Sequence, residues 1–297
     1  MTSSRSTKSG ALPLFAFVIV AWGLNWTVTK LIVTQVTPLW TTAIRTGMGT
    51  LALLALLTAS KQFNIPKRGD IPIIFTISLF HMVAFAALMT TGLKYVPVGR
   101  SIVLGYTTPL WVAPGAWLLL NEELSARQVI GIVIGLTGLA VMFNPAAFDW
   151  ADRDAVLGNG FLLLSALAWS VSILYTRAHR WIATPFQLVF WQALLATILL
   201  TILALIIEGE LQIVWSDTLI MWFAYSGLVG TALGFWAMAV VGRSVPATTT
   251  SLGILATPVV GIASSVALLG EQVDQALLIA TTMIIVGIGI GSFSRSS

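Results

Sequence analysis

A stretch of the sequence, residues 97–122, recurs at residues 246–271. Each copy opens with a Val-Pro pair, carries a Thr-Pro pair twelve residues later and ends in a Glu. The matching landmarks all lie 149 residues apart: Pro97 and Pro246, Pro109 and Pro258, Glu122 and Glu271. Because three landmarks rarely share one offset by chance, the pattern indicates an internal duplication.

The first halves of the two copies also agree, at an offset of 147 residues. The matching positions are Ala21-Trp22 with Ala168-Trp169, Lys30 with Arg177, and Thr37-Pro38 with Thr184-Pro185. The duplication therefore predicts a first repeat within residues 1–143, a linker loop at 144–156 and a second repeat within 157–297.

The composition places both repeats in a lipid bilayer. Hydrophobic residues make up 57% of the 297 residues and charged residues 9%, and the mean hydropathy is +0.94. Soluble domains carry about 25% charged residues, so this much apolar surface requires a membrane. The net charge of +4 is explained by basic cytoplasmic loops, and nucleic acid is not expected as a partner.

Ten membrane-spanning helices are predicted, because a span needs about 20 mostly apolar residues and charge clusters or Pro and Gly loops separate ten such stretches. The first repeat holds helices 1–5 and the second holds helices 6–10. The predicted ranges are 12–33, 38–59, 71–93, 97–119, 125–143, 157–179, 184–207, 216–241, 246–269 and 275–293.

The positions of Lys and Arg predict the orientation. With the N-terminus inside, ten of the 15 Lys and Arg residues fall on the inner side, and Arg45 lies within helix 2. The outer side holds four: Lys30, Lys94, Arg100 and Arg153. Cytoplasmic loops carry the excess of basic residues. We therefore expect both termini in the cytoplasm, the linker outside, and a location in a bacterial inner membrane.

An odd number of helices in each repeat gives the two repeats opposite orientations in the membrane. Inverted repeats are a building plan of secondary transporters, which bind substrate near the midplane where the repeats meet. The predicted fold is thus an all-α integral membrane protein with ten transmembrane helices, arranged as two inverted five-helix repeats around a central cavity.

The chain resembles a known family. The Ala-Trp pair in the first helix of each repeat, and the Pro, Thr-Pro and Glu landmarks of helices 4 and 9, are similar to those of EamA-type permeases of the drug/metabolite transporter superfamily. The Trp-rich chain is most similar to the YddG-type exporters of aromatic amino acids. This resemblance implies that helices 1–4 and 6–9 surround a central cavity, while helices 5 and 10 pack at the side.

Two ionisable side chains are candidates for substrate binding. Arg45 lies about 10 Å along helix 2 from Pro38, where an unpaired charge costs several kcal/mol. It either faces the cavity and attracts a substrate carboxylate, or it snorkels outward or hydrogen-bonds helix carbonyls as a structural clamp. His81 lies midway along helix 3. It either hydrogen-bonds the substrate or changes protonation during transport, or it is a structural residue that hydrogen-bonds a neighbouring helix. With no Cys and two His, no metal site is expected, and no cofactor is expected.

Aromatic and polar side chains inside the helices complete the candidate site. Trp22 and Trp169 are related by the repeat, so both are expected at the pseudo-symmetric centre, where they could stack on a planar ring. Asn25 lies on the face of Trp22, and Ser172 is its repeat equivalent. The remaining candidates for substrate binding are Tyr106, Tyr225 and Trp236.

Two prolines interrupt symmetry-related helices. Pro109 and Pro258 each remove a backbone hydrogen bond and are expected to kink helices 4 and 9 near the midplane. The kinks either act as hinges for alternating access or only shape the bundle. In helices 5 and 10, closely spaced Gly residues favour close packing within the chain, with homodimerisation through these helices as the alternative.

These features predict a secondary transporter that exports small amphipathic metabolites, most of all aromatic amino acids. An intramembrane enzyme is disfavoured because no Asp or Glu lies in a predicted helix interior. A channel fits inverted repeats less well. The partners are then a small-molecule substrate and membrane lipid. Within transport, sugars, nucleosides or flat cations, and import instead of export, remain alternatives.

Overall fold

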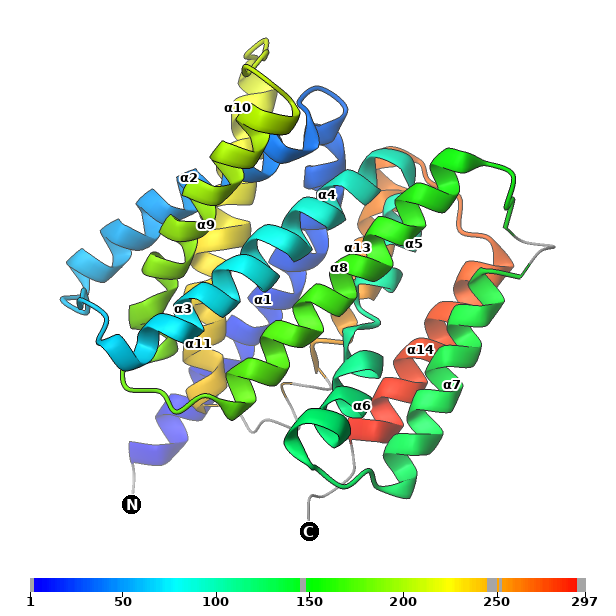
Figure 1. Ribbon diagram of the computed structural model, residues 1–297, viewed down its shortest axis with the longest axis horizontal. Helices are drawn as coiled ribbons and strands as arrows, with labels where there is room; N and C mark the ends of the chain where they lie inside the picture. The colour runs from blue at the N-terminus through cyan, green and yellow to red at the C-terminus, as the bar shows by residue number, and fades with distance from the viewer. Residues whose placement is uncertain (1–2, 145–147, 245–249, 251–252, 293–297) are drawn as a thin grey trace.

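The computed structural model describes residues 3–144, 148–244, 250 and 253–292. Within these ranges every regular element is a helix (Figure 1). Eight helices are long and apolar enough to cross a membrane, and two shorter apolar helices, Ala126–Met142 and Ala256–Leu269, accompany them. The structure thus confirms an all-helical integral membrane protein of about ten spans.

Several spans consist of more than one element. In the first repeat the elements are α1 (Ser3–Val33), α2 (Pro38–Ala59), η1 (Arg68–Asp70), α3 (Ile71–Thr76), η2 (Ile77–Phe85), α4 (Ala86–Tyr95), α5 (Val98–Gly105), α6 (Thr108–Leu120) and α7 (Ala126–Met142). In the second they are α8 (Arg153–Ala178), α9 (Pro185–Ile207), α10 (Asp217–Ala224), η3 (Tyr225–Leu233), α11 (Gly234–Ser244), α13 (Ala256–Leu269) and α14 (Gln275–Ser292).

The predicted ranges agree with these bounds to within a few residues, with two differences. Helix 1 begins earlier, at Ser3. The predicted helix 9, residues 246–269, starts in a segment that lies outside the described residues, and α13 forms its second half.

Contacts between α7 and α14 show the inverted relation of the repeats. A Cβ atom on Gly131 would lie 2.3 Å from the carbonyl oxygen of Gly287, and one on Gly138 would lie 3.0 Å from that of Ala280. The beginning of α7 therefore meets the end of α14, so the two helices are antiparallel. At the offset of 149, Gly138 corresponds to Gly287 and Gly131 to Ala280. The repeat relation therefore converts the contact of Gly131 with Gly287 into the contact of Ala280 with Gly138, as a two-fold axis requires.

The pseudo-two-fold axis passes between α2 and α9. The hydroxyl oxygens of Thr50 and Thr197, which are repeat equivalents at offset 147, lie 3.0 Å apart. A residue that touches its own equivalent must lie on the axis. The axis also relates the contact of α1 with α13 to that of α8 with α6: Gly23 packs on Thr257, and Ser170 donates to the carbonyl of Thr108 at 3.2 Å.

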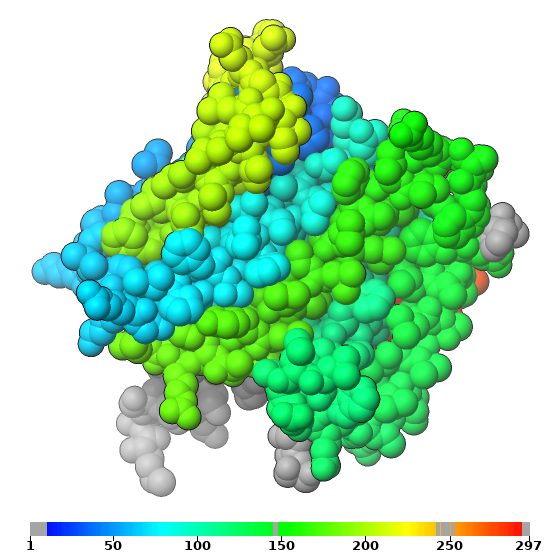
Figure 2. Space-filling view, viewed as in Figure 1, coloured from blue at the N-terminus to red at the C-terminus, as the bar shows by residue number. Residues whose placement is uncertain are grey.

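The remaining spans form a bundle beside the α7–α14 pair (Figure 1). This is the arrangement that the family resemblance implies. The start of α1 and the end of α14 lie on the same side of the molecule, which we call the termini face, and the turn between α4 and α5 lies on the opposite face (Figure 1). In the space-filling view, α10, α4 and α8 lie side by side over one flank of the bundle (Figure 2).

Large apolar side chains cover the outer surface of the bundle. Leu119, Val133 and Ile206 are 72%, 57% and 74% exposed. Many buried hydroxyl groups bond within their own helices instead; Thr42 Oγ1, for example, donates to the carbonyl of Pro38 at 2.9 Å. Because a bilayer offers no hydrogen bonds, apolar groups face outward and polar groups are satisfied internally.

The fourth span is broken rather than kinked, which corrects the prediction of a kink at Pro109. Helix α5 ends at Gly105, and α6 starts at Thr108 with Pro109 in its first turn. Proline is accepted in a first turn because the N–H it lacks has no helical partner there. The break therefore falls at Tyr106 and Thr107, ahead of the proline. Pro258 likewise lies in the first turn of α13.

Replacing Gly287 tests the close approach of α7 and α14. Gly287→Leu places side-chain atoms against the backbone of α7, where a Cβ would already lie 2.5 Å from the carbonyl oxygen of Gly131. Overpacking of this kind costs about 1–3 kcal/mol. We expect a lower unfolding temperature in detergent than for Gly289→Leu, because a Cβ on Gly289 meets nothing within 4 Å. Equal unfolding temperatures would contradict this packing.

Candidate functional site

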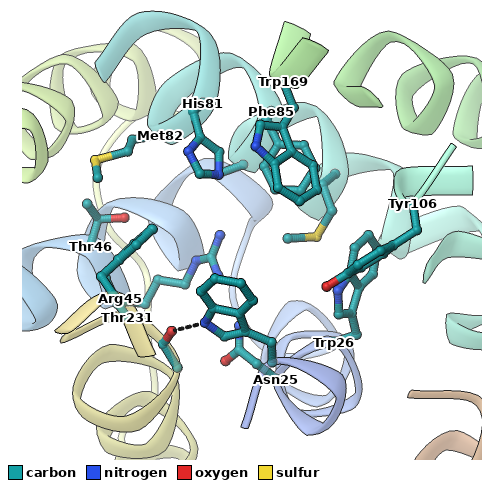
Figure 3. A pocket seen from close by; sticks show the side chains of 15 residues that line it. Asn25, Trp26, Arg45, Thr46, His81, Met82, Phe85, Tyr106, Trp169 and Thr231 are labelled. Atoms are coloured by element: carbon teal, nitrogen blue, oxygen red, sulfur yellow. Dashed lines mark hydrogen bonds between the residues drawn. The ribbon is translucent and has the colours of Figure 1, made fainter. Parts of the chain in front are cut away.

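A cavity of about 120 Å³ lies at the centre of the bundle, between the two repeats. Its walls come from α1, α2, η2, α4, the break between α5 and α6, α8, η3 and α11. The lining residues are Trp22, Asn25, Trp26, Arg45, Thr46, His81, Met82, Phe85, Ala86, Met89, Tyr106, Trp169, Gly230, Thr231 and Phe235 (Figure 3).

Two π-helices shape opposite walls of this cavity. The segments η2 (Ile77–Phe85) and η3 (Tyr225–Leu233) are the same length and lie 148 residues apart, so they are equivalents in the two repeats. A π-helix widens the turn and leaves the usual i–4 carbonyls free, and such segments are frequent at functional sites. In η3, Thr231 Oγ1 donates to the carbonyl of Ser226 at 2.9 Å.

Aromatic rings surround most of the cavity. His81 stacks on Trp169, with ring centroids 5.2 Å apart and planes 8° apart, and Trp169 meets Tyr106 edge to face at 6.0 Å. Tyr106 contacts Trp26 at 6.4 Å. From His81 the contacts continue to Trp22 through Phe235, which lies 6.0 Å from His81 and 6.1 Å from Trp22. We call these six residues the aromatic cluster; they present ring faces and edges to the cavity.

Arg45 is the cation of the cavity. Its side chain projects from α2, is 7% exposed, and has an Nε atom with no acceptor among the described residues. The ion pairs of the described residues are Arg177 with Glu122 and His179 with Asp70, so no carboxylate of this part of the chain neutralises Arg45. A buried guanidinium without a partner is costly, and it is strongly attractive to an anion that enters.

Asn25 adds an unpaired acceptor. Its Oδ1 atom is buried without a hydrogen-bond partner among the described residues. The amide packs on Gly230, where a Cβ would lie 2.6 Å from Oδ1, so only glycine allows this approach. Trp22 Nε1 donates to the carbonyl of Gly230 at 3.1 Å. Figure 3 shows Arg45 and Thr46 across the opening from Trp26 and Tyr106, so one side of the cavity is polar and the other aromatic.

Six of the nine residues predicted for substrate binding line the cavity. They come from five separate spans, and the structure brings them together as the repeat symmetry suggested. They are Trp22, Asn25, Arg45, His81, Tyr106 and Trp169. Their role in binding substrate stays a prediction.

The other three predicted residues lie away from the cavity, each for a geometric reason. Ser172 is buried in α8, one turn beyond Trp169, and is not among the residues that line the cavity. Tyr225 lies at the start of η3 and points toward α1, where its hydroxyl donates to the carbonyl of Ala21 at 3.1 Å. Trp236 follows Phe235 by one residue, about 100° around the helix, and packs in a core between α2 and α9.

Sequence reasoning missed several lining residues that helical spacing could have identified. Trp26 follows Trp22 by four residues and Phe85 follows His81 by four, so each shares a face with a predicted residue. Gly230 and Thr231 carried no such signal, because their placement depends on the π-helix of η3.

An inverted-repeat helical bundle with a central, aromatic-lined cavity, around a cation that no described carboxylate neutralises, defines an integral membrane protein of the transporter type. Residues 9–144 and 156–293 each match the EamA-like transporter family. The chain belongs to this family.

Similar proteins are also named as transporters or efflux pumps. The chain is 27% identical to a Salmonella typhimurium protein and 26% identical to an Escherichia coli protein, both named "Probable amino-acid metabolite efflux pump"; each match covers 97% of this chain and 96% of the relative. It is 24% identical to "Uncharacterized transporter YoaV" of Bacillus subtilis, over 94% of this chain and 95% of that one. A crystal structure at 20% identity shares the fold, with a TM-score of 0.68, over 96% of this chain and 98% of that chain.

A cysteine introduced into the cavity tests whether water reaches it. The chain has no native Cys, so a single variant gives an unambiguous signal. Thr46 lines the cavity, whereas Thr42, one turn earlier on α2, is fully buried and does not. We expect Thr46→Cys to react with a small methanethiosulfonate reagent at least about tenfold faster than Thr42→Cys, because only a hydrated thiol forms thiolate. Equal rates would contradict a wet cavity.

Proposed function

We propose that this protein is a secondary transporter that exports small amphipathic metabolites, foremost aromatic amino acids, from the cytoplasm of a bacterium. The observation that carries the proposal is the unpaired Arg45 beside the aromatic cluster. An aromatic amino acid presents a carboxylate for the guanidinium and a ring for the cluster, so it matches both halves of the cavity.

No carboxylate of the described residues pairs with Arg45, so the carboxylate of the substrate would supply the opposite charge. An arginine binds a carboxylate through two parallel hydrogen bonds, and the bond is stronger in a buried site than in water. The free Oδ1 atom of Asn25 is an acceptor for the substrate ammonium group. A flat organic cation without a carboxylate is disfavoured, because Arg45 repels it.

The aromatic cluster supports a ring as the other half of the substrate. Aromatic pairs add about 0.5–1.5 kcal/mol beyond the area they bury, through edge-to-face or offset contacts. At about 120 Å³ the cavity is smaller than the roughly 300–1,000 Å³ of pockets for drug-sized ligands. It is closer to the roughly 150 Å³ of a cavity that takes benzene. A small ring therefore suits it better than a large polycyclic drug.

The relatives' names support export of this class of compound, since two of them are named as amino-acid metabolite efflux pumps. The sequence has no G-x-x-x-x-G-K-[ST] motif of the kind that binds ATP phosphates, which favours transport driven by gradients. Alternating access exposes the cavity first to the cytoplasm, on the termini face, and then to the outside. The excess of Lys and Arg in the loops supports this orientation.

Flux in reconstituted liposomes tests the function and the role of Arg45 together. Liposomes loaded with labelled tryptophan should show saturable efflux that depends on the protein. Arg45→Met should reduce tryptophan flux by about tenfold or more, because losing one partner of a buried ion pair costs about 2–5 kcal/mol. Tryptamine, a cation that lacks the carboxylate, should instead gain flux, because Arg45 no longer repels it. Absence of saturable flux, with or without a pH gradient, would overturn the function.

Trp169→Ala tests the aromatic half of the cavity. The change removes the ring that stacks on His81 and contacts Tyr106. We expect the KM for tryptophan to rise about tenfold while alanine transport changes little, because only the ring of the substrate loses a contact. Trp236→Ala is the matched control, since Trp236 lies away from the cavity. A uniform loss for all substrates would show that Trp169 is structural.

A further inference from the structure

The turn between α4 and α5, on the opposite face, is held at both of its ends by charged side chains from other spans. Lys30, in the last turn of α1, donates through Nζ to the carbonyls of Leu93 and Val96 at the end of α4. Glu271, just after α13, accepts from the backbone N–H groups of Val98 and Gly99 at 2.7 and 3.0 Å. Cations favour helix C-termini and anions favour N-termini, so each charge matches the end it binds.

This clamp seats α5 against α13 and α14. A Cβ on Gly99 would lie 3.3 Å from Leu277 and 3.7 Å from Ile262, and Ile102 packs on Gly261. Val98, Ile102 and Leu277 belong to one buried apolar cluster. Held by this clamp, α5 covers the sides of α13 and α14 that carry Ile262 and Leu277.

The repeat equivalents of the two clamping charges behave differently. Lys30 corresponds to Arg177 at offset 147, and Glu271 corresponds to Glu122 at offset 149. On the termini face these two side chains bond to each other, Nη2 to Oε2 at 3.0 Å, with relative exposures of 46% and 43%. The equivalents of Val98 and Gly99 lie outside the described residues. The difference between the two faces is therefore that Lys30 and Glu271 bind backbone groups, whereas Arg177 and Glu122 bind each other.

The surface beside this exposed ion pair is hollow. A cavity of about 490 Å³ is lined by Glu122, Ala113 and Gln128 among others. At offset 149 these three correspond to Glu271, Ile262 and Leu277, the residues that α5 covers on the opposite face. The same surface is therefore packed under α5 in one repeat and lines a cavity in the other.

We propose that Lys30 and Glu271 form a latch that keeps the opposite face closed. The latch opens when both side chains leave the α4–α5 turn and pair with each other, as Arg177 and Glu122 do on the termini face. Lys30 and Glu271 bind the two ends of the same short turn, so the exchange needs no new charge. One ion pair then replaces four hydrogen bonds to backbone, and α5 is free to leave Leu277 and Ile262.

The inference rests on the alternating-access part of the proposed function, and its test needs no substrate. Single cysteines report on each face: Leu277→Cys, which α5 covers, and Gln128→Cys, which lines the open cavity. In detergent-solubilised protein with Lys30 and Glu271 unchanged, a hydrophilic maleimide reaches both faces and should label residue 128 and not residue 277. Glu271→Gln removes the charge that holds Val98 and Gly99. It should raise labelling at residue 277 by about tenfold and lower labelling at residue 128.

Glu208→Gln is the matched control. Glu208 accepts from the N–H groups of Leu39 and Trp40 at 2.9 and 3.0 Å, the same kind of cap, at the start of α2. Its equivalent at offset 147 is Lys61, so it has no counterpart in the latch. Glu208→Gln should leave both labelling rates unchanged.

The pattern of labelling separates the outcomes. Opposite changes at residues 277 and 128 support the latch. Equal increases at both mean that Glu271→Gln only loosens the fold, and unchanged rates mean that the cap does not control access; either result overturns the proposal. Tryptophan flux of the same variants, reconstituted in proteoliposomes, reports on the transport function separately, because flux can persist when the latch fails.

Discussion

A bilayer gives no hydrogen bonds to a protein, so every interruption of a helix must be satisfied by the chain itself. This constraint explains where the charged residues of the chain lie. Asp70, Glu208 and Glu271 each accept two backbone N–H groups near the start of a span in another part of the bundle. These carboxylates appear from the sequence to be ordinary loop residues, but each one binds the backbone of another span. They thereby help to fix the positions of the spans relative to one another.

The same constraint makes the central cavity possible. Its walls contain two π-helices and the break at Tyr106, all of which displace the regular backbone hydrogen bonds. Irregular backbone at membrane depth is tolerated where it is buried in protein or lines a water-filled space. The aromatic cluster and Arg45 thus occupy the place where the helices are least regular, and the lipid-facing helices α7 and α14 remain unbroken.

Much of the fold was predictable because hydrophobic length and the duplicated landmarks are both written directly in the sequence. Helix α2 was predicted with the bounds that it has, since Pro38 and the polar residues from Ser60 onward delimit it. The π-helices were not predictable, because they form through tertiary packing and leave no periodic pattern. For this reason Gly230 and Thr231 could not be identified from the sequence. Tyr225 and Trp236 were predicted to bind substrate because they are aromatic and lie deep in the membrane, but these properties do not determine which face of a helix a residue occupies. Neither residue lines the cavity.

The contact between Thr50 and Thr197 has a mechanical meaning. In the alternating access that we propose, the two repeats exchange conformations. A hydroxyl pair on the pseudo-two-fold axis would stay in place during that exchange, because a rotation does not move points on its axis. The threonine pair between α2 and α9 would then act as a fixed contact about which the two repeats could rock without separating there.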